Sequence, residues 1–318
     1  DQVSMVIVKR NLSELPFYPF NGKLSGPANC DISTPYGYGG PVISSTSKGV
    51  EAELFAGFRE ALHDYCEKNG IVTEFLRLHP LMQNHQLFGE DPGLLQKNST
   101  VWIDLRPTEQ EILAGMRKEH RRNIRIASDK GVEIILSDLR IDHLKEFHRL
   151  YTSRMETLDA LSIFFLPLEF FKELIATMRN HVDLFLAMWE GKVVSAYMFL
   201  HSGPYIHNFL SGSDRVHWDL RANVLTIYQV ALWAKSLGRQ FFHLGGGHAV
   251  ELDAVFRFKS QFSSNRSAYY MYRKIHDQIA HDQLDLMKQD HEAQNASQSS
   301  AELRQDPLLV GYFPAYRG

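Results

Sequence analysis

Apolar residues recur along the N-terminal part of the chain with two spacings, one typical of helices and one typical of strands. Residues 51–68 predict an amphipathic helix ending before Gly70, because four apolar residues fall on one face: Leu54, Phe58, Leu62 and Tyr65. Residues 71–80 alternate between apolar and polar positions and 101–105 follow a similar pattern, so both predict strands. The apolar run at 5–9 predicts a further, buried strand.

A second helix is predicted from Thr108 to about Asp129. Thr108 and Glu111 have the spacing of a capping box, in which each side chain satisfies a backbone N–H group of the other residue. The helix then leads through Gly131 into a strand predicted over 132–136. The first part of the chain therefore interleaves strands with helices.

The second half of the chain repeats this mixture. Two helices are predicted over 141–159 and 167–180, and a long helix from Asp219 to about Leu237. Four segments predict strands, 183–189, 193–201, 205–212 and 241–244, and the segment 266–275 closes the ordered core. The first two of these strands are joined by a three-residue hairpin signal at 190–192.

Antiparallel strands interleaved with helices in each half predict an α+β protein with two lobes. We expect the first lobe over 1–137, the second lobe over 138–275, and a polar C-terminal segment over 276–318. This segment is rich in Gln, Asp, His and Ser, but it ends in the aromatic stretch YFPAYR (312–317), which we expect to pack back on the body.

Composition narrows the classes of protein that this chain can belong to. It has 318 residues, 44% of them apolar, and a formal net charge of -3, so a large core is expected and a wholesale polyanion binder is not. Cys30 and Cys66 have no CxxC spacing, which argues against a disulfide scaffold or a structural zinc site. Without a long apolar run or a secretory signal, we expect a cytoplasmic protein, with an N-terminus trimmed or left out before Asp1.

Glycines 245–247 directly follow a predicted strand and precede a dense set of ionisable residues. Glycine permits close backbone approach, and N–H groups in such a turn can face an anion or a developing oxyanion. No GK[ST] or GxGxxG pattern is present. Beyond the glycines, Glu251 or Asp253 would accept a proton from an attacking amine, and Lys259 would stabilise negative charge. The alternative is a glycine turn followed by ordinary surface charges.

Two further segments carry candidate phosphate ligands. In RKEHRRNIR (117–125), Arg121 and Arg122 would anchor phosphates, either of a nucleotide-linked acceptor substrate or of an RNA backbone, unless this is simply a solvated helix face. Arg221 lies at the start of the long helix, where an N-terminus favours anions, although Asp219 there can act as a cap alone. Tyr228, two turns further on, is included with the acceptor-binding residues, but its position is more typical of core.

The stretch DISTPYGYGGP (31–41) places two tyrosines among glycines and prolines. Such a composition is typical of a well-packed turn. It also suits a preformed wall of a binding cleft, in which Tyr36 and Tyr38 offer flat apolar area with a polar end. Both readings stay open at this point.

Several segments occur here in the same order as in one family of proteins: DISTPYGYGGP, FLRLHPL (75–81), VWIDL (101–105), HRRNIRIAS (120–128), FHRLYTSRM (147–155), LGGG (244–247) and FRFKSQFS (256–263). From about residue 30 to 275 the chain resembles bacterial FemAB-like acyltransferases of the GNAT superfamily, which are related to the peptidoglycan bridge-forming aminoacyltransferases. The resemblance implies two GNAT-like lobes with mixed or antiparallel sheets flanked by helices, the first lobe incomplete at its N-terminus. It also implies transfer of an acyl group to an amine of a cell-envelope precursor, such as a nucleotide- or lipid-linked sugar or peptide.

The family's FK dipeptide corresponds here to Phe258-Lys259, whose lysine assists acyl transfer in related enzymes. Acyl-CoA is the donor that we favour slightly, although DLRANVL (219–225) lacks the glycines of the usual pyrophosphate turn. An aminoacyl-tRNA donor is the alternative, and a non-catalytic GNAT-like binding module is the rival outside enzymes. We expect no permanent cofactor, no metal, no DNA partner and no integral membrane segment, and a protein that is cytoplasmic or peripheral at the inner membrane.

Overall fold

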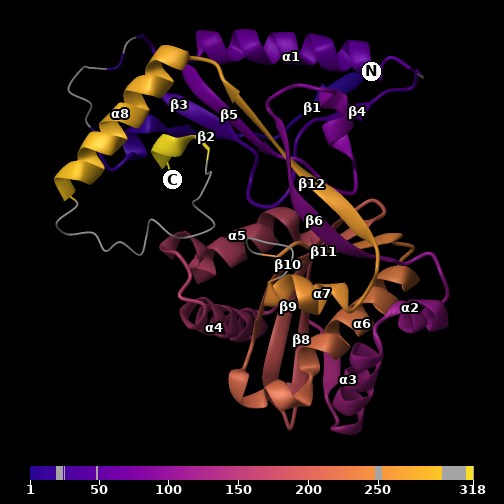
Figure 1. The fold of residues 1–318 in the computed structure, drawn as a ribbon. Coiled ribbons are helices and arrows are strands. Elements are labelled where there is room, and N and C mark those ends of the chain that lie inside the picture. The colour runs from indigo at the N-terminus through magenta and orange to yellow at the C-terminus, as the bar shows by residue number, and fades with distance from the viewer. Residues whose placement is uncertain (19–23, 25, 48, 248–252, 296–312, 318) are drawn as a thin grey trace. The chain divides into compact units, whose positions relative to one another are not determined.

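The computed structural model describes residues 1–318 except 19–23, 25, 48, 248–252, 296–312 and 318. The chain folds into two compact units, one of residues 1–99 with 268–318 and one of Thr100–Ser267 (Figure 1). The strands β6 (Leu94–Asp104) and β12 (Arg266–Ile275) contribute residues to both units. This division differs from the predicted boundary after residue 137, because α3 (Lys118–Asp129) packs against α6 (Ala222–Ser236) in the second unit.

The first unit is built on a mixed sheet. Its strands follow the order β2 (Val8–Asn11), β3 (Cys30–Ser33), β5 (Ile71–Arg77), β12. β3 and β5 run parallel, whereas β2 pairs with β3, and β12 with β5, in the antiparallel sense. A separate antiparallel ladder joins β1 (Gln2–Ser4) to β4 (Val42–Ser44).

Alternation along β5 buries both faces of this sheet. Ile71 belongs to a cluster with Leu62 and Cys66 of α1 (Glu51–Lys68), while Val72 belongs to a cluster with residues of α8 (Gln278–Asn295). The C-terminal aromatic stretch joins the α8 cluster through Tyr316, whose hydroxyl donates to Asp31 in β3. The prediction that YFPAYR packs back on the body is confirmed.

The second unit contains one sheet with the strand order β6-β11-β10-β9-β8-β7. The bounds of the strands that complete it are as follows: β7 (Glu133–Leu136), β8 (Val182–Trp189), β9 (Lys192–Ser202), β10 (Tyr205–Ser213) and β11 (Phe241–Gly245). Neighbouring strands are antiparallel except β10 and β11, which run parallel. The four strands predicted over 183–189, 193–201, 205–212 and 241–244 are thus confirmed as β8, β9, β10 and β11.

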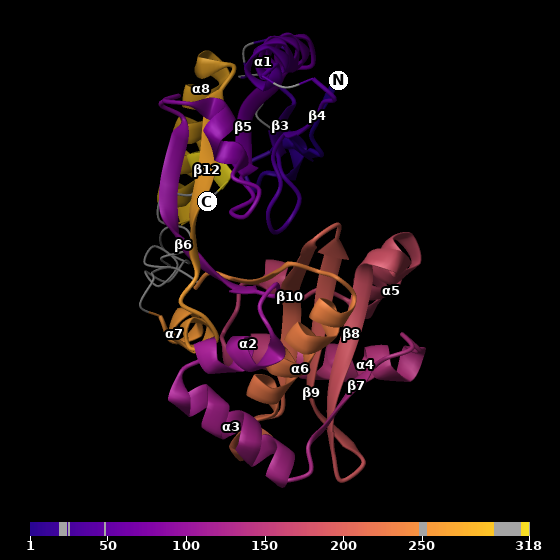
Figure 2. The ribbon, with the colours of Figure 1, turned by 90° about the vertical axis from the view of Figure 1, so that its right-hand side faces the viewer.

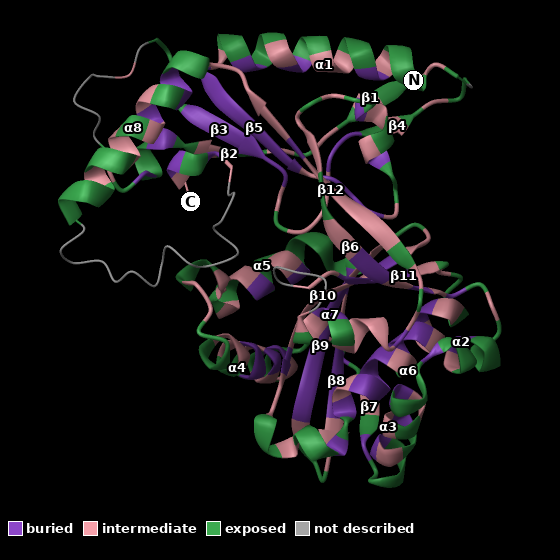
Figure 3. Ribbon diagram, in the orientation of Figure 1, coloured by how far each residue is buried: buried purple, intermediate pink, exposed green. Residues whose placement is uncertain are grey.

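Helices cover both faces of this sheet (Figure 2). Leu184 and Leu186 of β8 pack with α4 (Ile141–Thr157) and α5 (Leu168–Met178), whereas Phe185 and Ala187 point the other way, toward α3 and α6. Figure 3 shows the strands of this sheet as the buried layer, with exposed residues on the outer sides of the helices. The α+β class with two lobes of sheet and flanking helices is confirmed.

Four local predictions need correction. Residues 5–7 are not strand and Val6 is 72% exposed, so the apolar run at 5–9 is not buried. The helix predicted over 108–129 has its capping box, but it divides into α2 (Glu109–Gly115) and α3, because Met116 and Arg117 are extended. The hairpin turn has two residues, Glu190 and Gly191, both at positive φ, as tight hairpin turns require. The long helix begins at Ala222, after the short 3-10 helix η5 (Arg215–Leu220).

Candidate functional site

Two parallel strands separate in the second unit. β10 and β11 pair only over Tyr205–His207 and Phe241–His243. A register shift between Asn208 and Leu210 then turns β10 along β9, while β11 continues beside β6 to Gly245. Within the described residues the two strands have no further pairing, so backbone groups at this divergence are left to face a ligand.

The glycine run follows the end of β11, and its members differ in what they require. Gly245 has φ 82°, a conformation that favours glycine. Gly247 needs the space, because a Cβ there would lie 2.3 Å from Oδ2 of Asp253. Gly246 offers its carbonyl oxygen to the side chain of Lys259. The contact uses the carbonyl and not an N–H group, so the expected oxyanion role of the glycine N–H groups stays a prediction.

Lys259 lies in the last turn of α7 (Ala254–Ser260), a short helix whose first turn is capped by the Asp253 side chain. Its Nζ donates to the Gly246 carbonyl at 2.7 Å. Burial and the nearby positive charge of Arg154 lower the pKa of Lys259 to about 8, although the negative charge of Asp253 opposes this change. The structure therefore brings together Gly246, Asp253 and Lys259, three of the predicted site residues. Glu251 lies outside the described residues.

Arg154 is the residue of this neighbourhood that the sequence did not single out. It comes from α4, whose backbone approaches β10 so closely that a Cβ at Gly212 would lie 2.3 Å from the Leu150 carbonyl carbon. Arg154 also influences Tyr197 of β9, whose pKa is raised by burial while Arg154 lowers it. FHRLYTSRM contained Arg154 among the segments of the resemblance, but nothing in its spacing related it to Lys259.

The N-terminus of α6 supplies a second feature. Its N-cap is Arg221, with φ 57° and ψ 23°, so the backbone there takes the left-handed conformation without a glycine. No side chain caps this end, which leaves N–H groups of the first turn for an anion. Asp219, expected as the cap, instead accepts from Lys130 Nζ at 2.6 Å.

The remaining second-unit candidates make packing contacts or are exposed. The Arg121 guanidinium donates to the carbonyls of Ala114 and Met116 at the end of α2, while Arg122 is exposed. Tyr228 and Phe258 are half-buried against the core, and burial raises the pKa of Tyr228. These contacts favour structural roles for Arg121 and Phe258, and their roles in binding stay predictions.

Tyr36 and Tyr38 belong to the first unit. Tyr38 packs edge-on against Tyr269 at 5.3 Å between ring centroids, whereas Tyr36 is 62% exposed. The loop is held by Asn84, which donates to the carbonyls of Gly39 and Pro41. The stretch is thus a packed turn that also presents one tyrosine to solvent.

In the part of the chain that the structure describes, no three His, Cys, Asp or Glu side chains are placed to hold a metal ion. None of the helices among the described residues combines the length and apolar character needed to cross a bilayer.

Comparison with known proteins agrees with this architecture. Residues 114–260 match the model of the acetyltransferase (GNAT) domain. Among solved structures, FemX superposes with a TM-score of 0.60 and 12% identity, covering 86% of this chain and 88% of that one. A conserved protein of unknown function from Bacteroides thetaiotaomicron gives a TM-score of 0.51 and 11% identity over 76% of this chain and 78% of its own. No curated protein matches the sequence.

The fold and the domain match define a class. Residues 114–260 carry a GNAT acetyltransferase domain, and the chain has the fold of FemX, as the resemblance implied. The domain match includes α3, the divergence of β10 and β11, and Lys259.

Proposed function

We propose that this protein transfers an acyl group from acyl-CoA to an amine of a cell-envelope or polysaccharide precursor, with Lys259 at the transfer centre. The observation that carries the proposal is the contact between Lys259 Nζ and the Gly246 carbonyl, 2.7 Å apart at the end of β11. Burying an ammonium group costs free energy unless a hydrogen-bond partner offsets the cost. Ionisable groups with strongly shifted pKa values cluster at functional sites. The strand divergence beside it suits an extended donor.

The reaction is a direct transfer. The neutral amine of the acceptor attacks the thioester carbonyl carbon, the C–N bond forms, and the C–S bond breaks to release CoA thiol. A water molecule or a carboxylate, Asp253 or Glu251, takes the proton from the amine. The ammonium group of Lys259 steadies the tetrahedral oxyanion, a charge that exists only in the transition state and intermediate. Cys30 and Cys66 are buried in the first unit, and no covalent enzyme intermediate is required.

Acyl-CoA is favoured over aminoacyl-tRNA by the N-terminus of α6. The sequence lacks the usual glycines of a pyrophosphate turn, but Arg221 takes the positive φ that glycine would supply. The uncapped first turn and the Arg221 guanidinium would then hold the pyrophosphate of the donor. Gly245, Gly246, Gly247 and Phe258 complete the proposed donor-binding set.

The acceptor is proposed to be a nucleotide- or lipid-linked sugar or peptide with a free amine. Within the first unit, Tyr36 and Tyr38 are candidates for binding its apolar and hydroxyl surfaces. Within the second unit, Arg122 is a separate candidate for contacting a phosphate, whereas Arg121 and Tyr228 are engaged in packing contacts. A cytoplasmic protein, peripheral at the inner membrane, would meet such precursors where they are assembled.

A donor panel tests the proposal. Purified protein is incubated with amine-bearing precursors and with either acyl-CoAs or charged tRNAs, and acylated product is followed by mass spectrometry. We expect product with an acyl-CoA, insensitive to RNase and lost in Lys259→Met. Activity that requires charged tRNA and disappears with RNase would instead establish the aminoacyl-tRNA donor. Binding of a precursor without turnover from any donor would support a non-catalytic module.

A further inference from the structure

A polar pocket lies in the second unit, in a position to which we have assigned no function. It has a volume of about 350 Å³, at the lower end of the roughly 300–1,000 Å³ typical of small-molecule sites. We call it the Arg117 pocket. Its described lining consists of one glycine and of serine and arginine residues: Gly115, Arg117, Ser260, Ser263, Ser264 and Arg266. None of these residues carries a carboxylate, so the local charge is positive.

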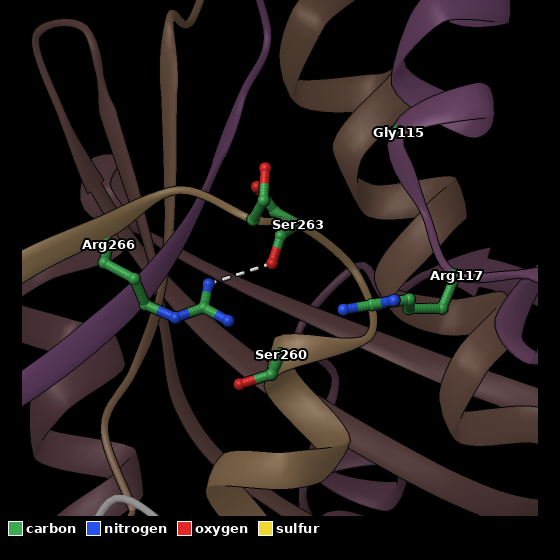
Figure 4. A pocket seen from close by; sticks show the side chains of 6 residues that line it. Gly115, Arg117, Ser260, Ser263 and Arg266 are labelled. Carbon is green, nitrogen blue, oxygen red and sulfur yellow. Dashed lines mark hydrogen bonds between the residues drawn. The ribbon is translucent and has the colours of Figure 1, made fainter.

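The two guanidinium groups converge. Figure 4 shows the side chains of Arg117 and Arg266 extending toward each other from opposite sides of the pocket, with Ser260 and Ser263 between them. Arg266 is oriented by bonds from Nη1 to the carbonyls of Ser263 and Asn265, both 2.9 Å long. Like charges repel when they are held near each other, and an anion between them removes that cost. The arrangement therefore favours an anionic occupant.

The backbone adds donors to the same place. Arg117 is the N-cap of α3, a helix of 12 residues, and no side chain caps its first N–H groups. The start of the helix is fixed to the turn after α7, because the Arg117 N–H donates to the Gln261 carbonyl at 2.8 Å. Independently, Oγ of Ser260 is buried and has no hydrogen-bond partner among the described residues. A buried hydroxyl without a partner is costly unless a ligand supplies one.

We propose that the Arg117 pocket binds a phosphate monoester of a small molecule. A phosphoryl dianion carries three acceptor oxygens, which match two guanidinium groups, serine hydroxyls and the N–H groups of a helix N-terminus. A carboxylate offers one fewer oxygen and half the charge. The limited volume favours a small phosphorylated molecule over an RNA backbone. This proposal does not depend on the proposed acyl transfer, because phosphate binding is measured without turnover.

Two matched pairs of variants test the site. Gly115→Asp places a carboxylate at the pocket, and Gly115→Asn places an uncharged group of the same shape; a Cβ at Gly115 meets nothing within 4 Å, so both are accommodated. Arg117→Gln removes one guanidinium, and Arg125→Gln removes an exposed charge of α3 that does not line the pocket. Thermal melting of each variant establishes that it folds.

Isothermal titration calorimetry with inorganic phosphate, at constant ionic strength, measures the binding. We expect saturable binding by the wild type, weakened about tenfold or more by Gly115→Asp and Arg117→Gln, and changed less than about threefold by the two controls. Acetate should bind far more weakly than phosphate. Tighter binding of CoA than of dephospho-CoA, dependent on Arg117, would identify the donor as the source of the phosphate. Tighter binding of glucose 6-phosphate than of inorganic phosphate, with the same dependence, would point to a sugar phosphate.

Three results would overturn the proposal. The first is the absence of saturable phosphate binding by the folded wild type. The second is equal weakening by Arg117→Gln and Arg125→Gln, which would mean a diffuse positive field rather than a site. The third is binding of a short RNA, sensitive to Gly115→Asp and much tighter than that of any phosphate monoester, which would make a polynucleotide the occupant.

Discussion

The side-chain amine of Lys259 is expected to titrate near pH 8. Its pKa falls from 10.5 to about 8 because burial disfavours the ammonium form and Arg154 repels it, while Asp253 opposes the change. At pH 7.5 such a lysine is about one quarter neutral, whereas a lysine with the ordinary value is only about 0.1% neutral. The folded protein binds the Lys259 proton more weakly than the unfolded chain does. The contribution of this group to the free energy of unfolding therefore rises with pH between about pH 8 and 10.5.

Competitive labelling with trace acetic anhydride, followed by peptide mass spectrometry from about pH 6 to 11, measures the midpoint for this one lysine. The pH midpoint of labelling is the readout, because partial burial of the lysine lowers the absolute labelling rate but leaves the midpoint unchanged. Arg154→Gln should raise the midpoint by removing the repelling charge. Asp253→Asn should lower it while keeping an acceptor at the helix cap. A midpoint near pH 10 in the folded wild type would refute the reasoning.

Three further predictions concern other parts of the molecule. Tyr36→Ala should raise the acceptor KM about tenfold or more in steady-state kinetics. It should change the free energy of unfolding by less than about 0.5 kcal/mol in thermal melting, because the side chain is 62% exposed. Comparable damage to acceptor affinity and to stability would make the loop purely structural. Gly212→Ala should destabilise by about 1–3 kcal/mol in denaturant unfolding, because its Cβ meets the α4 backbone, whereas Gly57→Ala in α1 should be neutral or stabilising. Burial alone would raise the pKa of Glu74, but His276 Nε2, 3.4 Å from Oε2, and two hydrogen bonds from Arg59 hold it below its usual value. Glu74→Gln should therefore cost about 3–5 kcal/mol in the same assay, and a loss below about 1 kcal/mol would contradict the pairing.

Much of the fold could be predicted because local signals and tertiary packing agree. The helix over 51–68 begins and ends where its apolar stripe and Gly70 place it. The second-half strands follow from β-branched and aromatic runs separated by turn residues. The break between α2 and α3 could not be predicted, because it depends on burial of Met116 and on Arg121 bonding to the end of α2.

The candidate site could be predicted only in part. The glycine run and Lys259 lie close in sequence, so their association could be proposed from the chain alone. The contributions of Arg154, brought in by α4, and of the Arg117 pocket depend on segments that meet only in the folded protein. The positive φ at Arg221 carries no sequence signal, because glycine usually marks such a position.

The role assigned to the lysine is tested most directly by single-turnover acyl transfer from acetyl-CoA in wild type and Lys259→Met, with donor affinity measured alongside. We predict that the rate falls about 100-fold or more, the scale of losing one oxyanion-stabilising group, while the donor Kd changes less than about threefold. A folded variant that transfers the acyl group as fast as wild type would contradict the assignment.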